Sequence, residues 1–186
     1  MGLTTELVPP GAAFQALRAA VEHLKGGHPL TPVTVVVPTN AAGVTARRWL
    51  GRTGGIAAVD MLPLGRVAEV LAGPQLAAAG RRPVSAPVIE LVLGDLLAAD
   101  PGGFGAVAGH PSTIVALREL HHELRLAGPD APNLLAGNSV RGQIAAQVSV
   151  RLSARLAERW YDTADLLATA ADVIARGSLP ERLTRL

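Results

Sequence analysis

The sequence has no cysteine, a single lysine, few aromatic residues and no long apolar run. Without cysteine, a disulfide framework and a thiolate metal site are both excluded. No apolar stretch reaches the roughly 18 residues that a membrane-spanning helix requires. The first ten residues carry Glu6 and no basic residue, which is not the pattern of a signal peptide. We therefore expect a cytoplasmic protein with no membrane partner.

Small aliphatic residues are abundant instead. Hydrophobic residues make up 49% of the 186 residues and aromatic residues only 3%, which suits closely packed helices better than an all-β sandwich. The formal net charge of +2 is too small to indicate, by itself, a strongly electrostatic nucleic-acid binder. Every basic residue other than Lys25 is an arginine. A GC-rich genome would produce that bias, and arginine would also suit bidentate phosphate contacts.

The first 72 residues alternate between strand and helix patterns. Leu3–Val8 is a short apolar run that predicts a first strand, and Val33–Val37 is a β-branched run typical of a strand buried in a parallel sheet. Ile56–Leu62 predicts a third strand. This alternation predicts an α/β fold with a parallel sheet of about three strands, incomplete and similar to that of P-loop NTPases. Helical patterns follow the three strands at residues 14–24, 40–50 and 67–71.

From Gly73 onward the patterns are helical, at residues 87–99, 112–127 and 143–176, with no convincing strand between them. Ser112 is a suitable cap for the second. Asp162 and Asp165 resemble a capping box and predict a break in the third. We expect residues 1–72 to form the α/β part and 73–160 a mainly helical insertion. Residues 161–186 are expected to return toward the α/β part and to end at a truncation point in a longer protein.

Residues 9–16 lie where a phosphate-binding loop would follow the first strand. Such a loop needs glycines whose neighbouring amides wrap the phosphates, a lysine, and a serine or threonine for magnesium. When the segment is aligned with G-x-x-x-x-G-K-[ST], all four required positions fail, being occupied by Pro9, Phe14, Gln15 and Ala16. We therefore expect no ATP binding and no cofactor. The alternative to a degenerate nucleotide loop is an ordinary strand-to-helix turn. The predicted degenerate nucleotide loop comprises Pro9, Pro10, Gly11, Gln15 and Ala16.

Residues 33–50 resemble motif Ia of the UvrD-type superfamily 1 helicases, in which a buried strand runs into T-N-x-A-A and a helix with basic residues. Thr39 and Asn40 match this pattern, whereas Pro38 departs from it. The resemblance implies that Thr39 and Asn40 contact single-stranded DNA at the strand end. Capping of the following helix is the alternative role for both residues. The auxiliary phosphate contacts are expected to be Arg47, Arg48 and Arg66.

Three further segments are similar, in chain order, to the AddB-type subunits of bacterial recombination nucleases: residues 64–68, 119–128 and 159–170. The sequence thus resembles the N-terminal part of helicase-like proteins that carry a PD-(D/E)XK nuclease domain near their C-terminus. The resemblance implies a DNA-repair or recombination scaffold with a lost ATP site. Its expected partners are single-stranded DNA, the rest of its own chain and a motor or nuclease subunit. The nuclease Asp and Glu-x-Lys have no match here, so no catalytic residue is expected, although the parent protein could be a nuclease.

Other kinds of site are less well supported. His121 and His122 point about 100° apart on a helix, so we expect a solvated helix face and no metal site. No serine lies in a G-x-S-x-G context, and G-x-G-x-x-G is absent, which disfavours a serine hydrolase and a dinucleotide-binding enzyme. Arg151, Arg155 and Arg159 form a stripe that could be solvated or could contact nucleic acid or a partner subunit. A helical protein–protein interaction or regulatory module remains the alternative function.

Overall fold

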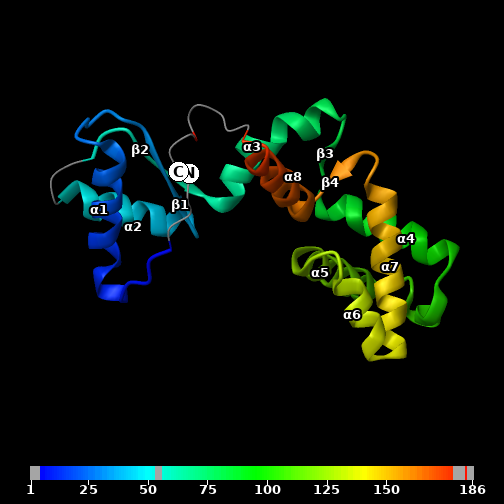
Figure 1. The fold of residues 1–186 in the computed structure, drawn as a ribbon. Coiled ribbons are helices and arrows are strands. Elements are labelled where there is room, and N and C mark those ends of the chain that lie inside the picture. The colour runs from blue at the N-terminus through cyan, green and yellow to red at the C-terminus, as the bar shows by residue number, and fades with distance from the viewer. Residues whose placement is uncertain (1–4, 53–55, 178–182, 184–186) are drawn as a thin grey trace. The chain divides into compact units, whose positions relative to one another are not determined.

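The computed structural model describes residues 5–52, 56–177 and 183. Helices predominate among them, and the chain divides into two compact units (Figure 1). The first unit takes residues from both ends of the chain, 1–71 and 171–186, and the second comprises 72–170. The chain therefore combines a small parallel α/β unit with a mainly helical unit inserted into it.

The first unit is built around two parallel strands. The β1–β2 ladder pairs Val33 with Val59 at one end and Val37 with Pro63 at the other. Val21 of the first helix packs with Val33 and Val59 in a buried core. The elements are η1 (Pro10–Ala12), α1 (Ala13–Lys25), β1 (Val33–Val37), α2 (Asn40–Arg52), β2 (Val59–Pro63) and α3 (Leu64–Ala78), the last of which continues into the second unit.

Local signals fix several of these bounds. The predicted strand Val33–Val37 is confirmed without any shift in its ends. The α1 helix ends where Gly26 adopts a left-handed conformation with φ of 57°, which glycine reaches without a Cβ clash. Gly43 lets α2 approach the sheet closely, because a Cβ there would lie 3.2 Å from Met61 Cβ and 3.3 Å from Val37 Cγ2.

The predicted three-stranded sheet is not found in the described residues. Of Leu3–Val8, the structure describes Thr5–Val8, which form no strand, and Leu7 is 96% exposed. This short run includes the charged Glu6 and ends at two prolines without N–H groups, so it has little to bury or pair. β1 pairs only with β2 among the described residues, and Val36 is 44% exposed, so β1 is not buried on both faces.

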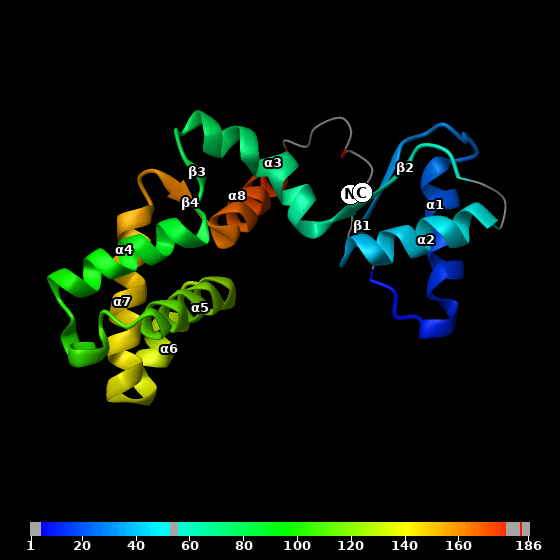
Figure 2. The same ribbon diagram turned by 180° about the vertical axis from the view of Figure 1, so that it is seen from behind.

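The second unit is a helical assembly whose core lies between α4, α5 and α7 (Figure 2). Its most buried side chains include Leu93, Leu97, Leu117 and Leu152. None of the described helices combines the length and the apolar character needed to cross a membrane. The elements are β3 (Arg82–Pro83), α4 (Ala86–Ala99), η2 (Gly102–Val107), α5 (Pro111–Ala127), α6 (Ala131–Asn138), α7 (Val140–Leu156), β4 (Trp160–Tyr161) and α8 (Thr163–Ala175).

The predicted break between the last two helices is confirmed. Asp165 N donates to Asp162 Oδ1 at 2.8 Å and Asp162 N donates to Asp165 Oδ2 at 3.3 Å, which is a reciprocal capping box. Two expectations for this part were wrong. The N-cap of α5 is His110, whose side chain accepts from Ser112 N, and Ser112 is itself helical. A two-stranded parallel sheet, β3–β4, is also present, and its two-residue strands are too short to show a period.

Candidate functional site

The carboxyl ends of β1 and β2 lie at the same edge of their parallel sheet, because Val37 pairs with Pro63 at the end of the ladder. Thr39 and Asn40 follow β1, and Arg66 is the third residue of α3, which follows β2 directly. Open α/β sheets bind ligands outside the carboxyl ends of their strands. The ladder therefore brings three of the predicted contact residues to one edge of the sheet.

Thr39 and Asn40 are exposed at the amino end of α2. The Thr39 hydroxyl accepts a hydrogen bond from Ala42 N at 3.1 Å, and its carbonyl accepts from Gly43 N at 3.1 Å, so Thr39 caps the helix. A hydroxyl that accepts in a cap keeps its own proton to donate. The capping role raised from the sequence and a contact to an external anion are therefore compatible.

Arg47 and Arg48 are displaced from this edge. They follow Asn40 by seven and eight residues, which is about 10 Å along the helix axis. The Arg47 guanidinium donates to the Val59 carbonyl at 3.0 Å and so ties α2 to the amino end of β2. The Arg48 side chain is exposed and forms no hydrogen bond or ion pair with other described residues. The structure does not bring Arg47 to the strand end.

Arg66 lies near the strand end, but its guanidinium pairs with Glu69 one turn further along α3. Both side chains are more than half exposed, at 64% and 53%. Exposed pairs of this kind contribute about 0–1 kcal/mol, so a phosphate could replace the carboxylate at little cost. Arg66 is thus the best placed of the three auxiliary arginines.

The predicted nucleotide loop is a tight entry to α1. Pro10–Ala12 forms one 3-10 turn, closed by a bond of 2.9 Å from Ala12 N to the Pro9 carbonyl, and α1 follows at once. Both prolines lack an N–H group. Gln15 and Ala16 lie in the first turn of α1. A phosphate cradle needs successive free N–H groups, and neither proline provides one.

Lys25 supports the first unit from the far end of α1. Its ammonium group donates to the carbonyls of Pro29, Thr31 and Ala57 at 2.7, 2.8 and 2.7 Å. These three bonds use all three protons of the ammonium group. Lys25 therefore holds together the segments that precede β1 and β2, and it is not available to a phosphate at the entry to α1.

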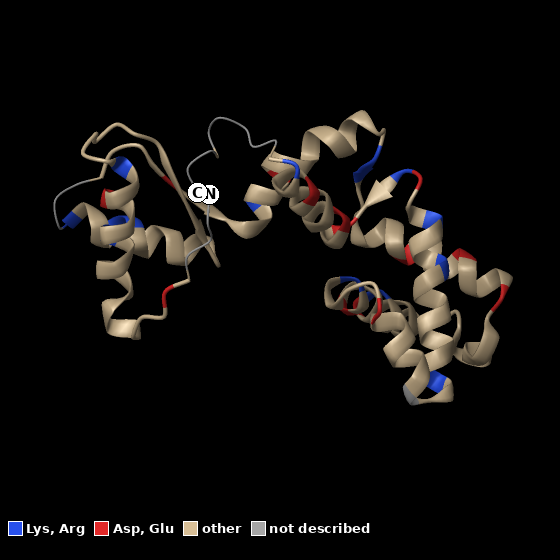
Figure 3. Cartoon of the chain, in the orientation of Figure 1, with Lys and Arg blue, Asp and Glu red and all other residues tan. Residues whose placement is uncertain are grey.

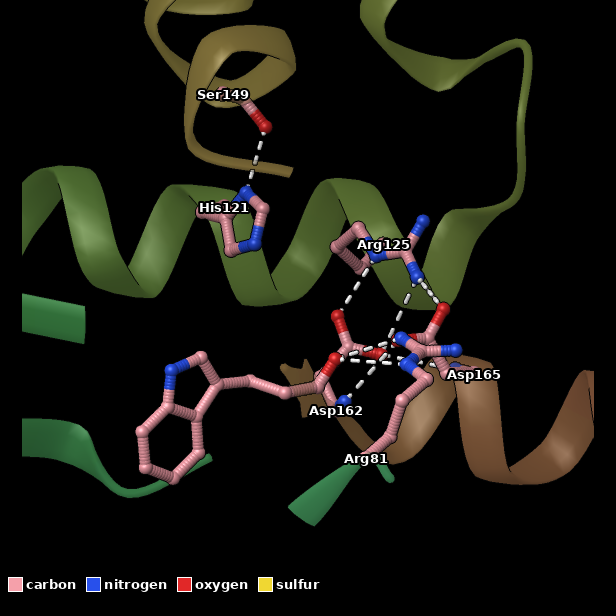
Figure 4. Close-up of polar contacts among 7 residues, drawn as sticks. Arg81, His121, Arg125, Ser149, Asp162 and Asp165 are labelled. Atoms are coloured by element: carbon pink, nitrogen blue, oxygen red, sulfur yellow. Dashed lines mark hydrogen bonds and ion pairs between the residues drawn. The ribbon is translucent and has the colours of Figure 1, made fainter. Parts of the chain in front are cut away.

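The second unit contains a second candidate site, an arginine–aspartate cluster (Arg81, Arg125, Asp162 and Asp165) (Figure 4). The Arg125 Nε lies 2.7 Å from Asp162 Oδ2, and its Nη2 also reaches Asp165. Arg81 Nη2 lies 2.6 Å from Asp165 Oδ2. The cluster joins the start of β3, the end of α5 and the capping box of α8, and it borders a cavity of about 290 Å³.

The surroundings of Asp162 and Arg125 favour the charged form of each side chain. Burial alone would raise the pKa of Asp162, but hydrogen bonds from Arg125 and from the Asp165 backbone outweigh it and lower that pKa. The bond to Asp162 is the main reason that the pKa of Arg125 is raised. Both groups therefore stay charged near neutral pH and neutralise one another, so the cluster has the character of a structural clamp.

His121 is not part of a solvated helix face, which corrects the sequence-based expectation. Its side chain is 3% exposed, and Nδ1 lies 2.9 Å from Ser149 Oγ of α7 (Figure 4). Burial lowers the pKa of His121, although Asp162 acts in the opposite direction. A Ser–His pair can activate a nucleophile, but Ser149 is only 5% exposed in the middle of a helix. The pair therefore fastens α5 to α7.

Acidification is expected to destabilise the second unit through His121. Its folded-state pKa lies below 6.5, so the unfolded chain takes up the proton first and the unfolding free energy falls as pH drops below 6.5. The slope should approach, at most, about 1.4 kcal/mol per pH unit. Urea titrations between pH 7 and 5 measure it. His121→Gln should flatten this dependence and the exposed His122→Gln should not; an equal slope in all three proteins would contradict the assignment.

Among the described residues, no three His, Asp or Glu side chains are grouped so that they could hold a metal ion. The sequence patterns alone could not have found the clamp, because its partners come from distant segments, but Asp162 and Asp165 were marked by their capping-box spacing.

Comparison of the chain with models of protein families and with curated proteins finds no match.

Proposed function

We propose that this chain is an ATP-independent, helicase-like scaffold that contacts single-stranded DNA at the carboxyl end of β1. By its sequence resemblance it would be the N-terminal part of an AddB-type, UvrD-like helicase–nuclease protein of DNA repair or recombination. Its partners would be the rest of its own chain and a motor or nuclease subunit in the cytoplasm. The proposal includes a P-loop-like parallel sheet of about three strands in the complete fold.

One observation carries the proposal: the parallel β1–α2–β2 arrangement presents exposed Thr39 and Asn40 where two strands end together. Backbone N–H groups at the amino end of α2 add partial positive charge there, which favours a phosphate. Arg66 lies near the same edge, and a phosphate could replace Glu69 in its exposed ion pair. Thr39, Asn40 and Arg66 would contact phosphates, so binding would be weak, dependent on salt and indifferent to base order.

The entry to α1 supports the proposed lack of ATP binding. The motif lysine is absent, and the single lysine of the chain is held by three carbonyls elsewhere. Isothermal titration of the chain with Mg-ATP should therefore give no heat of binding at micromolar concentrations. A clear micromolar isotherm would remove the ATP-independent part of the proposal.

The strand-end contact is tested by replacing its two side chains. The double variant Thr39→Ala with Asn40→Ala should weaken binding of a fluorescein-labelled oligothymidylate about tenfold, because two hydrogen bonds to an anion are lost. The measurement is fluorescence anisotropy at low salt, with helix content checked by circular dichroism. Wild-type affinity in the double variant would contradict the assignment of Thr39 and Asn40 as DNA contacts.

A matched control keeps the hydroxyl of residue 39 and removes only its methyl group. Thr39→Ser keeps the hydroxyl that caps α2 and should bind the oligonucleotide as the wild type does. If Thr39→Ser loses affinity as strongly as Thr39→Ala, the threonine methyl group rather than the hydroxyl matters, which is inconsistent with a hydrogen bond to phosphate.

A protein–protein interaction module is the second candidate, favoured by an apolar groove in the second unit. The groove measures about 580 Å³ and lies between α5, α7 and α8, with Leu124, Leu126, Val150 and Leu167 in its lining. Leu126 and Val150 are 46% and 54% exposed. Exposed apolar side chains around a groove are typical of interaction surfaces. Absence of any oligonucleotide binding by the intact chain would favour this candidate.

A further inference from the structure

A second groove of the helical unit is lined by arginines. It measures about 630 Å³, within the size range of ligand sites, and lies between α4 and the carboxyl end of α7. Val92 and Leu96 form its apolar wall. Its basic residues are Arg151 and Arg155 of α7 and Arg159 of the following turn, and Trp160 of β4 also lines it.

Two of these arginines have their charges available. Arg151 pairs with Asp100 at 2.9 Å, whereas Arg155 and Arg159 are exposed and form no ion pair or side-chain hydrogen bond with other described residues. The three arginines recur every four residues and all line the groove, and Figure 3 shows basic positions along α7. Glu158 is the acidic residue of the lining. The groove thus keeps an excess of positive charge.

This charge is local. Residues 72–170 contain eight arginines and nine acidic residues, so the unit as a whole has no positive excess that would explain the groove. Elsewhere in the unit, Arg81, Arg118 and Arg125 each pair with a carboxylate. Arg155 and Arg159 differ from these three arginines in being exposed and in lining a groove together.

The backbone that carries Arg159 and Trp160 is fixed from behind. The Arg159 carbonyl accepts from Arg82 N at 2.9 Å in the β3–β4 ladder. The Trp160 carbonyl accepts from Arg81 Nε and Nη2 at 3.0 and 2.7 Å, and Arg81 is held in turn by Asp165. Trp160 also packs against the leucine-rich core. The structural clamp thus positions the aromatic side chain at the groove.

We propose that this groove binds single-stranded nucleic acid, with Arg155 and Arg159 on consecutive phosphates and Trp160 against a base. Non-specific single-strand sites combine a cationic track with aromatic side chains, and the lining of this groove holds three arginines and the half-buried Trp160. The inference concerns the ligand class of the proposed function but rests on different residues in a different unit. It adds a binding track on the helical unit, away from the strand end of β1 in sequence.

The test uses the intact chain and a short fluorescein-labelled oligothymidylate at several salt concentrations. Arg155→Gln with Arg159→Gln should weaken binding about tenfold at low salt. Each lost phosphate contact should also reduce the slope of log K against log salt by about 0.7. In a Trp49→Phe background, Trp160 is the remaining tryptophan, and its emission should be quenched when the oligonucleotide binds.

A matched control lies on the same helix. Arg141 is exposed on α7 outside the groove, so Arg141→Gln removes the same charge without removing a proposed contact. It should leave the affinity within about twofold of the wild type, because only the long-range charge changes. Equal weakening by Arg141→Gln and Arg155→Gln would overturn the groove, since overall charge would then explain both.

The outcomes separate this groove from the strand end. Loss of affinity only in the Thr39 and Asn40 variants, without Trp160 quenching, would overturn the groove and leave the proposed function intact. Loss only in the Arg155 and Arg159 variant, with quenching, would support the groove and reject the strand end. Binding of an oligoglutamate peptide to the groove, without binding of oligothymidylate, would overturn the nucleic-acid assignment. If the intact chain binds no oligonucleotide at all, both the groove and the strand-end site are overturned.

Discussion

Arg125→Met is expected to lower the unfolding free energy of the helical unit by about 3 kcal/mol at pH 7. The substitution keeps the aliphatic bulk but removes the cation that binds Asp162 and Asp165. Asp162, whose side chain is 17% exposed, would then hold a half-buried charge without an opposite partner. Urea denaturation followed by Trp160 emission, in a Trp49→Phe background, measures the change.

The loss should depend on pH in a defined direction. The folded-state pKa of Asp162 is lowered from its ordinary value of 3.8, so the stabilisation by Arg125 is complete above that value and disappears as pH falls through the folded-state pKa. The difference between the wild type and Arg125→Met should therefore narrow as the pH falls. Arg125 also lowers the pKa of His121, so its removal weakens the His121 pH dependence and adds to the narrowing between pH 7 and 5. A difference that widens on acidification would contradict this account.

Two variants control for charge and packing. Arg125→Lys keeps the charge but cannot reach both carboxylates with a planar fork, so it should lose an intermediate amount of stability. Arg141→Met removes an exposed arginine from α7 and should change the unfolding free energy by less than about 0.5 kcal/mol. A loss as large in Arg141→Met as in Arg125→Met would mean that the clamp contributes nothing specific.

Gly142→Ala should destabilise the same unit by about 2 kcal/mol or more. A Cβ at this position would lie 2.3 Å from the Leu135 carbonyl oxygen, which belongs to the backbone of α6. Alanine gains at most about 1 kcal/mol over glycine from helix propensity. Moving one helix away from the other costs more than that gain, because α6 and α7 pack closely and Ser139 caps α7 at Gly142 N.

The matched control for this substitution is Gly137→Ala. Gly137 is an exposed residue of α6, and a Cβ there would meet nothing within 4 Å. Without a clash, only the helix propensity acts, and stability should stay the same or rise by up to about 1 kcal/mol. Thermal melts of both variants test this prediction. If the melting temperature of Gly142→Ala equals or exceeds that of Gly137→Ala, the close approach of α6 and α7 is wrong.

The candidate strand-end site was only partly predictable. Thr39 and Asn40 could be placed at the end of a strand because the Val33–Val37 run and its flanking prolines are local signals. The separation of Arg47 from that end could not be predicted, because its partner is the Val59 carbonyl on another strand. The sequence places the arginine on the correct helix but does not reveal which backbone group it meets across the sheet.

By itself, the sequence determined the elements whose signals lie within a few residues of one another. The glycine stop of α1, the bounds of β1 and the Asp162–Asp165 capping box are of this kind, since a helix end or a β-branched run is a short-range preference of the backbone. Tertiary structure alone decided which polar groups are buried together. His121 and Ser149 are 28 residues apart, and Arg81 and Asp165 are 84 apart. Their burial and charge depend on how α5, α7 and the β3–β4 pair pack, and no local pattern encodes that packing.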